Sequence, residues 1–225
     1  MLKILTFTSL FPNAIQPVHG IFVENRLRHL VNSGNVNATV VAPVPWFPSR
    51  NERFKPYSDY AHVPLTEKRH GLTIYHPRYP VIPKIGTNLA PLLMYLFVKP
   101  FIGKLIRQGF EFDLIDAHYF YPDGVAAALL GRRFDKPVTV TARGTDINLL
   151  PQYALPRAQI KWAANSVQGM ITVCQALKDE LTALDVDPDK VRVLRNGVDL
   201  EMFQPGDRVT IRKKLNLKGP ALLSV

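Results

Sequence analysis

The stretch Asp113–Thr141, DLIDAHYFYPDGVAAALLGRRFDKPVTVT, decides the fold class of this chain. Asp113–Ala117 form a short β-type run, Asp123–Arg133 are rich in alanine and leucine as helices are, and Pro137–Thr141 return to β-branched residues. A strand, a helix and a second strand in this order predict a right-handed crossover between two parallel strands. The stretch therefore indicates an α/β protein.

The same alternation continues on both sides of this unit. We expect further strands at Leu2–Thr8, Ala38–Ala42, Leu72–His76, Gly169–Val173 and Lys190–Leu194. Helices are expected at Ile21–Val31, at Asn88–Gln108 (interrupted or kinked near Pro100), at Arg157–Asn165, at Gln175–Leu184 and over 207–217. Pro43–Gly71 and Val81–Gly86 show little periodicity and are predicted to be surface loops. The pattern predicts a parallel sheet covered by helices on both faces.

The composition is that of a globular protein with a full-sized core. The chain has 225 residues, of which 47% are hydrophobic. The single cysteine, Cys174, excludes an internal disulfide and gives no metal-binding spacing, which favours a reducing compartment. The N-terminus suits a first strand better than a signal peptide. The longest apolar run, Leu89–Val98, is far shorter than a membrane-spanning helix requires.

The charge favours anionic partners. There are 28 Lys and Arg against 18 Asp and Glu, for a net charge of +10 and a pI of about 9.8. Nucleotides, phosphorylated lipids and membrane surfaces all fit such a balance, and solubility alone would also explain it. No nucleic acid partner is expected, because the chain lacks zinc spacings, an RNP-like strand and basic runs interleaved with aromatics.

In a parallel sheet, ligands bind beyond the carboxyl ends of the strands. The unusual residues of this chain follow four such ends, after Thr8, Ala117, Thr141 and Leu194. The first loop places His19-Gly20 before a helix N-terminus, where backbone N–H groups and the helix dipole favour a phosphate. A glycine required only for turn geometry is the alternative.

The second and third loops carry ionisable side chains. His118 ends a strand and could hydrogen-bond a sugar hydroxyl or shield developing charge, or be structural. Asp116 and Asp123 are expected to make a strand-end polar contact and to supply a helix N-terminal charge. In the third loop Arg143 can bind a phosphate or carboxylate and Asp146 can accept from hydroxyls, unless the two form a pair that fixes the loop.

The fourth loop reads RNGVD. Asn196-Gly197 suits a tight turn with positive φ, and Asp199 follows it. This segment is expected to act as a hinge or linker.

Together these elements resemble the N-terminal half of a GT-B glycosyltransferase, in particular of family 4 (the group 1 glycosyltransferases). The resemblance covers nearly the whole chain. It is carried by MLKILTFTSLFP and HGIFVENRLRHL, by DLIDAHYFYPDGVAA, by the strand followed by RGTD, and by ITVCQALKDEL and VRVLRNGVDLEMFQP. Two departures stand out: His19-Gly20 replaces the paired glycines of many members, and Arg143 replaces the histidine of their H-G-x-D element.

The resemblance implies retaining transfer of a sugar from a nucleotide-sugar donor to a glycan or lipid-linked acceptor, without a metal and without a cofactor besides that donor. The N-terminal, Rossmann-like domain would hold the acceptor and a second domain the donor nucleotide. It implies that His118 is catalytic. It further implies substrate binding by His19, Gly20, Arg143 and Asp146, and passage between the domains at Asn196, Gly197 and Asp199.

The resemblance also suggests how the chain is divided. Residues 1–200 would form the acceptor-side domain, and residues 201–225 a linker and, with ALLSV at the end, the first strand of a truncated donor-binding domain. These 225 residues alone would then be inactive. The acceptor would depend on Pro43–Gly71 and Val81–Gly86. The expected location is cytoplasmic, with peripheral contact to the inner face of the membrane as a further hypothesis.

The competing hypothesis is a non-catalytic membrane-docking or ligand-binding module. Leu92–Arg107 contains apolar residues that could face a bilayer and cations that could meet anionic headgroups. The apolar residues are Phe97, Phe101, Ile102, Leu105 and Ile106, and the cations are Lys99, Lys104 and Arg107. A core helix explains the same apolar residues. A nucleotide-dependent oxidoreductase is disfavoured, because no G-x-G-x-x-G fingerprint is present.

Overall fold

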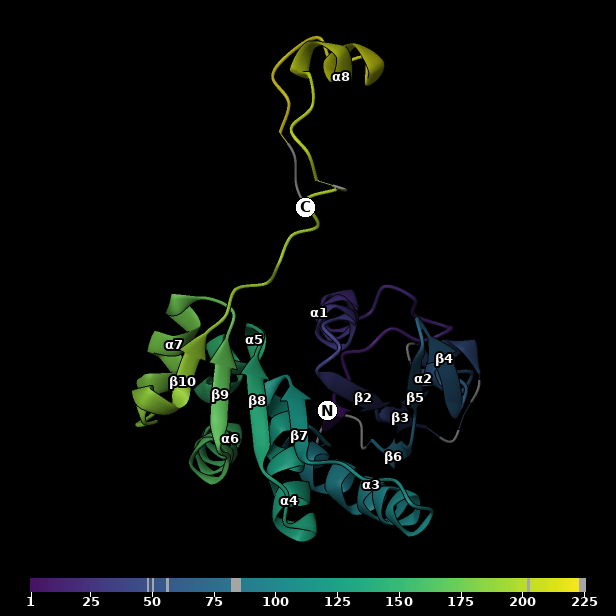
Figure 1. Ribbon diagram of the computed structural model, residues 1–225, viewed down its shortest axis with the longest axis vertical. Helices are drawn as coiled ribbons and strands as arrows, with labels where there is room; N and C mark the ends of the chain where they lie inside the picture. The colour runs from purple at the N-terminus through teal and green to yellow at the C-terminus, as the bar shows by residue number, and fades with distance from the viewer. Residues whose placement is uncertain (48, 50, 56, 82–85, 202, 223–225) are drawn as a thin grey trace.

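The computed structural model describes residues 1–47, 49, 51–55, 57–81, 86–201 and 203–222 (Figure 1). Its centre is an eight-stranded sheet in which every neighbouring pair is parallel except β4–β5. The strands, in spatial order, are β10 (Val191–Val193), β9 (Gly169–Thr172), β8 (Val138–Ala142), β7 (Leu114–His118), β1 (Leu2–Phe7), β2 (Val36–Val41), β5 (Leu72–Tyr75) and β4 (Thr66–Arg69).

Helices cover both faces of this sheet, as the sequence predicts. Along β1 the side chains alternate: Leu5 and Phe7 join a large apolar cluster with α3, α4 and α6, whereas Ile4 joins a smaller one with α1. The helices are α1 (Ile21–Asn32), α2 (Tyr57–Tyr60), α3 (Ala90–Arg107), α4 (Val125–Phe134), α5 (Thr145–Asn148), α6 (Ala154–Ser166), α7 (Gln175–Thr182) and α8 (Arg208–Lys214). Short helical turns lie at η1 (Glu52–Phe54), η2 (Gly86–Leu89), η3 (Phe120–Gly124), η4 (Leu150–Gln152) and η5 (Pro188–Lys190).

Helix α3 is continuous through Pro100, so the expected interruption is absent. Pro100 lies on the exposed side of the helix. The opposite side buries Met94, Val98 and Ile102, each contributing about 1.5–3 kcal/mol of apolar burial. Among the helices of the described residues, none combines the length and apolarity that crossing a bilayer requires.

The predicted loop at Pro43–Gly71 is wrong in part. Its described residues include β4 and also β3 (Val44–Trp46), which pairs with β6 (Arg78–Pro80) in a separate two-stranded parallel sheet. A two-residue turn, His70-Gly71, with φ of 48° and 81°, joins β4 to β5. β4 has the sequence TEKR. Charged residues suit a strand at the edge of a sheet, but they lack the apolar pattern by which a buried strand is predicted. Most of the loop predicted at Val81–Gly86 lies outside the described residues.

Beyond β10 the chain leaves the sheet. It rises from the carboxyl end of β10 to α8, which lies apart from the rest of the structure (Figure 1). Asp207 caps α8 by accepting from the N–H of Thr210 at 2.8 Å, and the helix buries no residue. Ala221 and Leu222 form no strand, and residues 223–225 lie outside the described part. The domain division near residue 200 stays a prediction.

Helix α4 packs on β8 through Gly131. A Cβ at this position would overlap Val138 Cγ2 and lie 2.8 Å from the carbonyl oxygen of Lys136. Gly131→Ala should therefore destabilise the protein by about 1–3 kcal/mol, measured by urea unfolding. Gly103→Ala is the control: its Cβ would meet only Arg107, at 3.7 Å, and should stabilise by about 0.5–1 kcal/mol. Equal effects of the two variants would contradict this packing.

Candidate functional site

The predicted site residues lie at the carboxyl ends of the parallel strands, the upper edge of the sheet in Figure 1. His118 is the last residue of β7 and pairs in register with Thr141 of β8. Arg143 follows β8 directly, and Asn196 lies shortly after β10. The parallel order of these strands therefore gathers residues that are far apart in the sequence.

A chain of hydrogen bonds runs from Arg143 through His118 to Asp116. Arg143 Nη2 lies 2.7 Å from His118 Nδ1, and His118 Nε2 lies 3.1 Å from Asp116 Oδ2. Because a guanidinium can only donate, Nδ1 accepts, and the ring proton must reside on Nε2 and point at Asp116. Burial lowers the pKa of His118, an effect that Asp116 opposes and Arg143 and Arg26 reinforce. The imidazole is therefore neutral and held in one tautomer.

Asp116 is the negatively charged end of this series of hydrogen bonds. It is buried, and its second oxygen, Oδ1, accepts from the hydroxyl of Thr139 at 3.1 Å. Burial alone would raise the pKa of Asp116, but the interactions with His118, Arg26 and Thr139 outweigh it and lower the pKa to about 2. Asp116 is therefore a fixed anion beneath the imidazole, the strand-end contact expected from the sequence.

The side chain of Arg143 contacts three other residues of the site. Its Nη1 donates to Asn196 Oδ1 at 3.1 Å, and its guanidinium carbon lies 5.0 Å from the centroid of the Phe22 ring. Its Nε is buried and has no partner among the described residues. Burial and the nearby charge of Arg26 lower the pKa of Arg143 to about 10. A partly desolvated cation thus joins β8, helix α1 and the segment that leaves the sheet.

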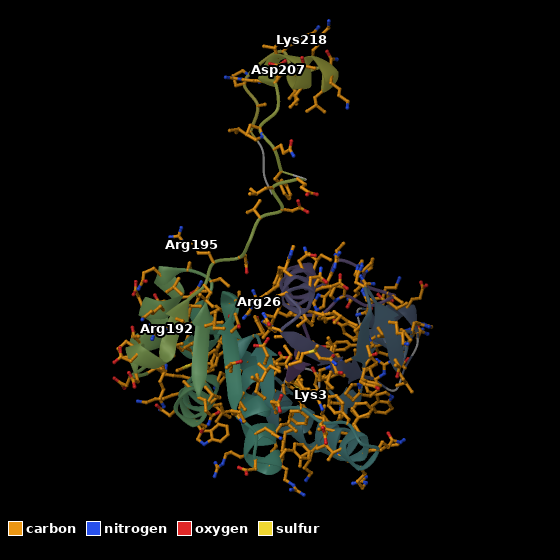
Figure 2. All side chains as sticks on the ribbon, in the orientation of Figure 1. Lys3, Arg26, Arg192, Arg195, Asp207 and Lys218 are labelled. Atoms are coloured by element: carbon orange, nitrogen blue, oxygen red, sulfur yellow. The ribbon has the colours of Figure 1, made fainter. Side chains whose placement is uncertain are left out.

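Arg26 is a second cation at this edge. It extends from α1 across to β8, where its Nη1 donates to Thr141 Oγ1 at 2.9 Å. Figure 2 shows Arg26 in the space between α1 and the strands that end near α5. With Arg143 it gives the site two positive charges, facing the buried anion of Asp116. This arrangement attracts anionic groups.

Asp146 fixes the turn after β8 through backbone amides. Its carboxylate accepts from the N–H groups of Phe120 (2.6 Å), Arg143 (3.0 Å) and Gly144 (2.7 Å). Burial raises the pKa of Asp146, and these amides oppose the rise. The loop-fixing alternative therefore describes Asp146 in this structure, although the bond comes from the Arg143 backbone. Binding of substrate hydroxyls by Asp146 stays a prediction.

Gly20 and His19 shape the entry to α1. Gly20 has φ 68°, and a Cβ there would overlap the carbonyl of Leu10, so only glycine fits. His19 Nε2 lies 3.2 Å from the carbonyl oxygen of Ser9, to which it can donate. Both residues thus hold the loop after β1 against the start of α1. Phe22, two residues beyond Gly20, contacts the guanidinium of Arg143 with its ring and so connects helix α1 with the site.

The segment after β10 differs from its prediction in one respect. Gly197 does not have a positive φ, and no turn forms at Asn196-Gly197. Asn196 instead reaches Arg143 through its side chain. The turn comes later: Asp199 Oδ1 accepts from Glu201 N at 2.9 Å, and its carbonyl accepts from Phe203 N at 2.8 Å.

Arg26 and Phe22 were not predicted from the sequence, and no local signal marks them on an ordinary amphipathic helix. Asp123, expected as a helix N-terminal charge, accepts from the backbone N–H and the hydroxyl of Ser9 and so joins the loops after β1 and β7. Burial raises the pKa of Asp123 to about 7. In the described part of the chain, no cluster of three or more His, Cys, Asp or Glu could hold a metal ion.

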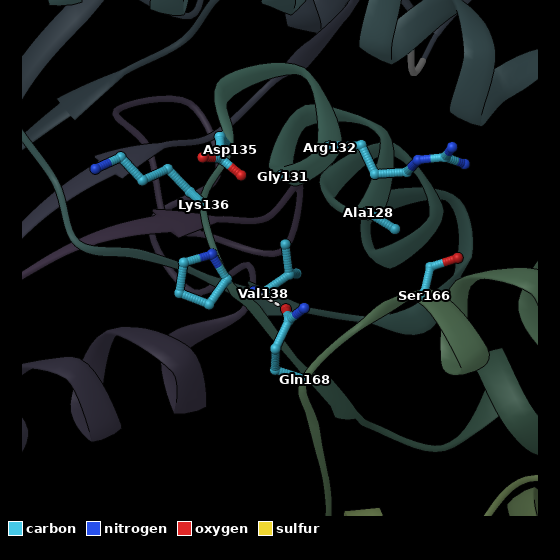
Figure 3. A pocket seen from close by; sticks show the side chains of 9 residues that line it. Ala128, Gly131, Arg132, Asp135, Lys136, Val138, Ser166 and Gln168 are labelled. Atoms are coloured by element: carbon cyan, nitrogen blue, oxygen red, sulfur yellow. Dashed lines mark hydrogen bonds between the residues drawn. The ribbon is translucent and has the colours of Figure 1, made fainter.

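A hollow of about 360 Å³ lies at the opposite edge of the sheet, beside the starts of β8 and β9 (Figure 3). Gln168 there accepts from the N–H of Val138 at 2.7 Å. Figure 3 shows Arg132 and Lys136 extending to opposite sides rather than converging. The cations of this hollow therefore do not converge, unlike Arg143 and Arg26 at the other edge of the sheet.

Known proteins resemble this chain in sequence. The model of Glycosyltransferase Family 4 matches residues 20–202. TuaC of Bacillus subtilis (strain 168), named as a teichuronic acid biosynthesis glycosyltransferase, is 30% identical over 222 residues, covering 96% of this chain and 55% of TuaC. A D-inositol 3-phosphate glycosyltransferase of Frankia alni is 31% identical over 117 residues, covering 47% of this chain and 28% of that protein. The chain thus spans about half the length of TuaC.

Solved structures share the fold at lower identity. Sucrose-phosphate synthase from Thermosynechococcus elongatus has a TM-score of 0.63 at 13% identity, covering 96% of this chain and 53% of that chain. Anabaena HepE in complex with UDP has a TM-score of 0.52 at 17% identity, covering 96% and 50%.

The charged Asp116 should make the protein sensitive to acid. Because its folded pKa is lowered from 3.8 to about 2, its stabilising contribution is present above about pH 4 and is lost as the pH falls through 2. The stability advantage of the unaltered protein over Asp116→Asn should shrink by about 2 kcal/mol over that interval, measured by urea unfolding. The exposed Glu180→Gln serves as control. An advantage independent of pH would contradict the ionised state of Asp116.

Proposed function

This chain belongs to glycosyltransferase family 4, and from that membership we propose that it forms the acceptor-binding half of a retaining glycosyltransferase. The eight-stranded Rossmann-like sheet is that of an N-terminal GT-B domain. The enzyme would move a sugar from a nucleotide-sugar donor to a glycan or lipid-linked acceptor. The donor site would lie mainly in a second domain, so these 225 residues alone would not catalyse transfer. The proposed reaction needs no metal ion.

The observation that carries this proposal is the convergence of Arg143, His118 and Asn196 at the ligand-binding edge of the sheet. Arg143 uses two of its five N–H donors on His118 and Asn196. The guanidinium is thereby oriented before a ligand arrives. Glycosyl transfer releases a nucleoside diphosphate, and preorganised cations stabilise the negative charge that develops on it. Arg143 and Arg26 supply such charge.

The comparisons support a nucleotide-sugar donor. HepE was solved with UDP and with UDP-glucose, at TM-scores of 0.52 and 0.50 to this chain. Its likeness to this chain concerns the fold alone. Because ligands of open parallel sheets bind beyond the carboxyl ends of the strands, the donor diphosphate would approach the Arg143 edge from the second domain.

His118 has a defined role in this scheme. His118 is 1% exposed, and both of its ring nitrogens are hydrogen-bonded. It orients the guanidinium of Arg143 and connects that group, through hydrogen bonds, with the carboxylate of Asp116. The expected contact between His118 and the transferred sugar stays a prediction, and it requires Arg143 to release Nδ1. Asn196 would couple the segment between the domains to the same cation.

Replacing Arg143 tests the proposal. In the full-length enzyme incubated with a panel of UDP-sugars, Arg143→Gln should lower the rate of UDP release by about 100-fold or more, because an oriented charge is lost at the leaving group. Arg192→Gln, on the exposed side of β10, should leave the rate unchanged. Absence of nucleotide-sugar binding by the unaltered enzyme, or full activity of Arg143→Gln, would overturn the proposal.

Peripheral membrane contact is a second proposal, and the outer surface of α3 favours it. Leu92, Leu96 and Phe97 are 45%, 44% and 50% exposed, and Lys104 and Arg107 are exposed near the end of the helix. Two residues that were expected to face a bilayer, Ile102 and Leu105, are buried instead, with 0% and 8% of their surface exposed. The prediction that they belong to the docking surface is therefore wrong. Lipid-linked acceptors would be reached from such a position.

Vesicle sedimentation tests this surface. The protein should sediment with phosphatidylglycerol vesicles at low salt, and less at high salt or with phosphatidylcholine vesicles, because exposed cations contribute. Leu92→Ser combined with Phe97→Ser should reduce sedimentation several-fold by removing apolar insertion. Val18→Ser, at an exposed apolar residue elsewhere, is the control. Equal sedimentation of all variants would contradict the α3 surface.

A further inference from the structure

A second hollow lies between the small β3–β6 sheet and the segment before β4. It has a volume of about 580 Å³, within the range of small-ligand pockets. Its lining is apolar and aromatic apart from one cation, and consists of Trp46, Phe47, Ala61, Val63, Pro64, Leu65 and Arg78. We call it the Trp46–Arg78 pocket.

This pocket lies on the same edge of the main sheet as Arg143. β3 follows the carboxyl end of β2, and β6 follows that of β5, so the small sheet extends beyond these two strand ends. Along the sheet, β2 and β5 are three and four strand spacings from β8, about 14 and 19 Å. An elongated ligand could therefore occupy both places.

The walls offer flat aromatic and apolar surface to a ligand. Trp46 is 50% exposed and Leu65 67%, so two large apolar side chains face solvent at one place. Phe47 is held from behind by Phe54 and Tyr57, with ring centroids 5.3 and 5.4 Å away. These contacts fix one wall, while the rim residues stay accessible.

Arg78 is the unusual member of the lining. One guanidinium nitrogen, Nη2, donates to the carbonyl of Val63. The other, Nη1, is buried and has no partner among the described residues. Burial lowers the pKa of Arg78, and the lining contains no acidic side chain. A cation held in an apolar setting with an unused donor is costly unless an anion or acceptor meets it.

We propose that the Trp46–Arg78 pocket binds an acidic sugar residue of the acceptor, with its carboxylate on Arg78 and the apolar face of its ring on Trp46. The inference rests on the proposed function, since it names the acceptor as an anionic glycan. Arg78 Nη2 is bonded to Val63 and Nη1 is shielded from solvent, so the attraction on a carboxylate comes from the charge of Arg78, which no acidic side chain of the lining balances. The reactive end of the acceptor would then lie toward Arg143, and the acidic sugar would lie further along the glycan, in the Trp46–Arg78 pocket.

Calorimetric titration tests this assignment. The probes are trigalacturonic acid and its methyl ester, which lacks the negative charges and carries a methyl group on each carboxyl, added to the full-length protein. The acid should bind at least about tenfold more tightly than the ester, and Arg78→Gln should abolish that difference. Trp46→Ala should weaken binding of both probes. Because Trp46 is exposed, this variant is informative even if Arg78→Gln fails to fold.

Arg53→Gln is the matched control, an exposed arginine of η1 outside the lining, and should behave as the unaltered protein. Equal affinity for acid and ester, or acid binding unchanged in both pocket variants, would overturn the assignment. Binding of a panel of nucleotide-sugars is measured in parallel. Its absence from the unaltered protein would overturn the proposed function, whereas its persistence in Arg78→Gln together with lost acid binding would support the assignment of the pocket.

Discussion

The hydrogen-bond chain from Arg143 through His118 to Asp116 is the interaction on which the candidate site depends. It places a buried anion, a neutral imidazole and a cation in line at the ends of two neighbouring strands. A buried carboxylate is tolerated only where donors and positive charge compensate its lost hydration. The cation is in turn held in place by the imidazole, and through Asn196 and Phe22 it reaches the segment after β10 and helix α1.

Two further buried carboxylates hold the loops around this chain. Asp146 accepts three backbone N–H groups from the loops after β7 and β8, and Asp123 accepts from Ser9 in the loop after β1. Gly20 allows that last loop to approach the start of α1 closely. These hydrogen bonds order the loops at the sheet edge in the absence of a ligand, and such preorganisation would reduce the entropy lost on binding.

The structure shows where some of the positive charge of the protein lies. The net charge of +10 belongs to the chain as a whole, whereas three cations at this edge of the sheet, Arg143, Arg26 and Arg78, are partly buried. Arg143 and Arg26 lie at the edge where a donor diphosphate would approach, and Arg78 lies in an apolar pocket further along the same edge. Because they are shielded from water, their interactions with anions are stronger than those of surface lysines.

The sequence by itself determined the α/β class, the main strands and helices and the four loops that carry polar residues, because hydrophobic periodicity and turn residues are local signals. It did not reveal β4, whose charged residues suit an edge, or the pairing of β3 with β6. Only the tertiary structure decided the partners of each site residue. Arg26 and Phe22 enter the site because α1 packs beside β1, and His118 became a neutral positioning group because Arg143 and Asp116 lie on either side of it. Gly197 lacks its expected turn, and Asn196 bonds to Arg143. These are contacts between residues distant in sequence, which no local pattern encodes.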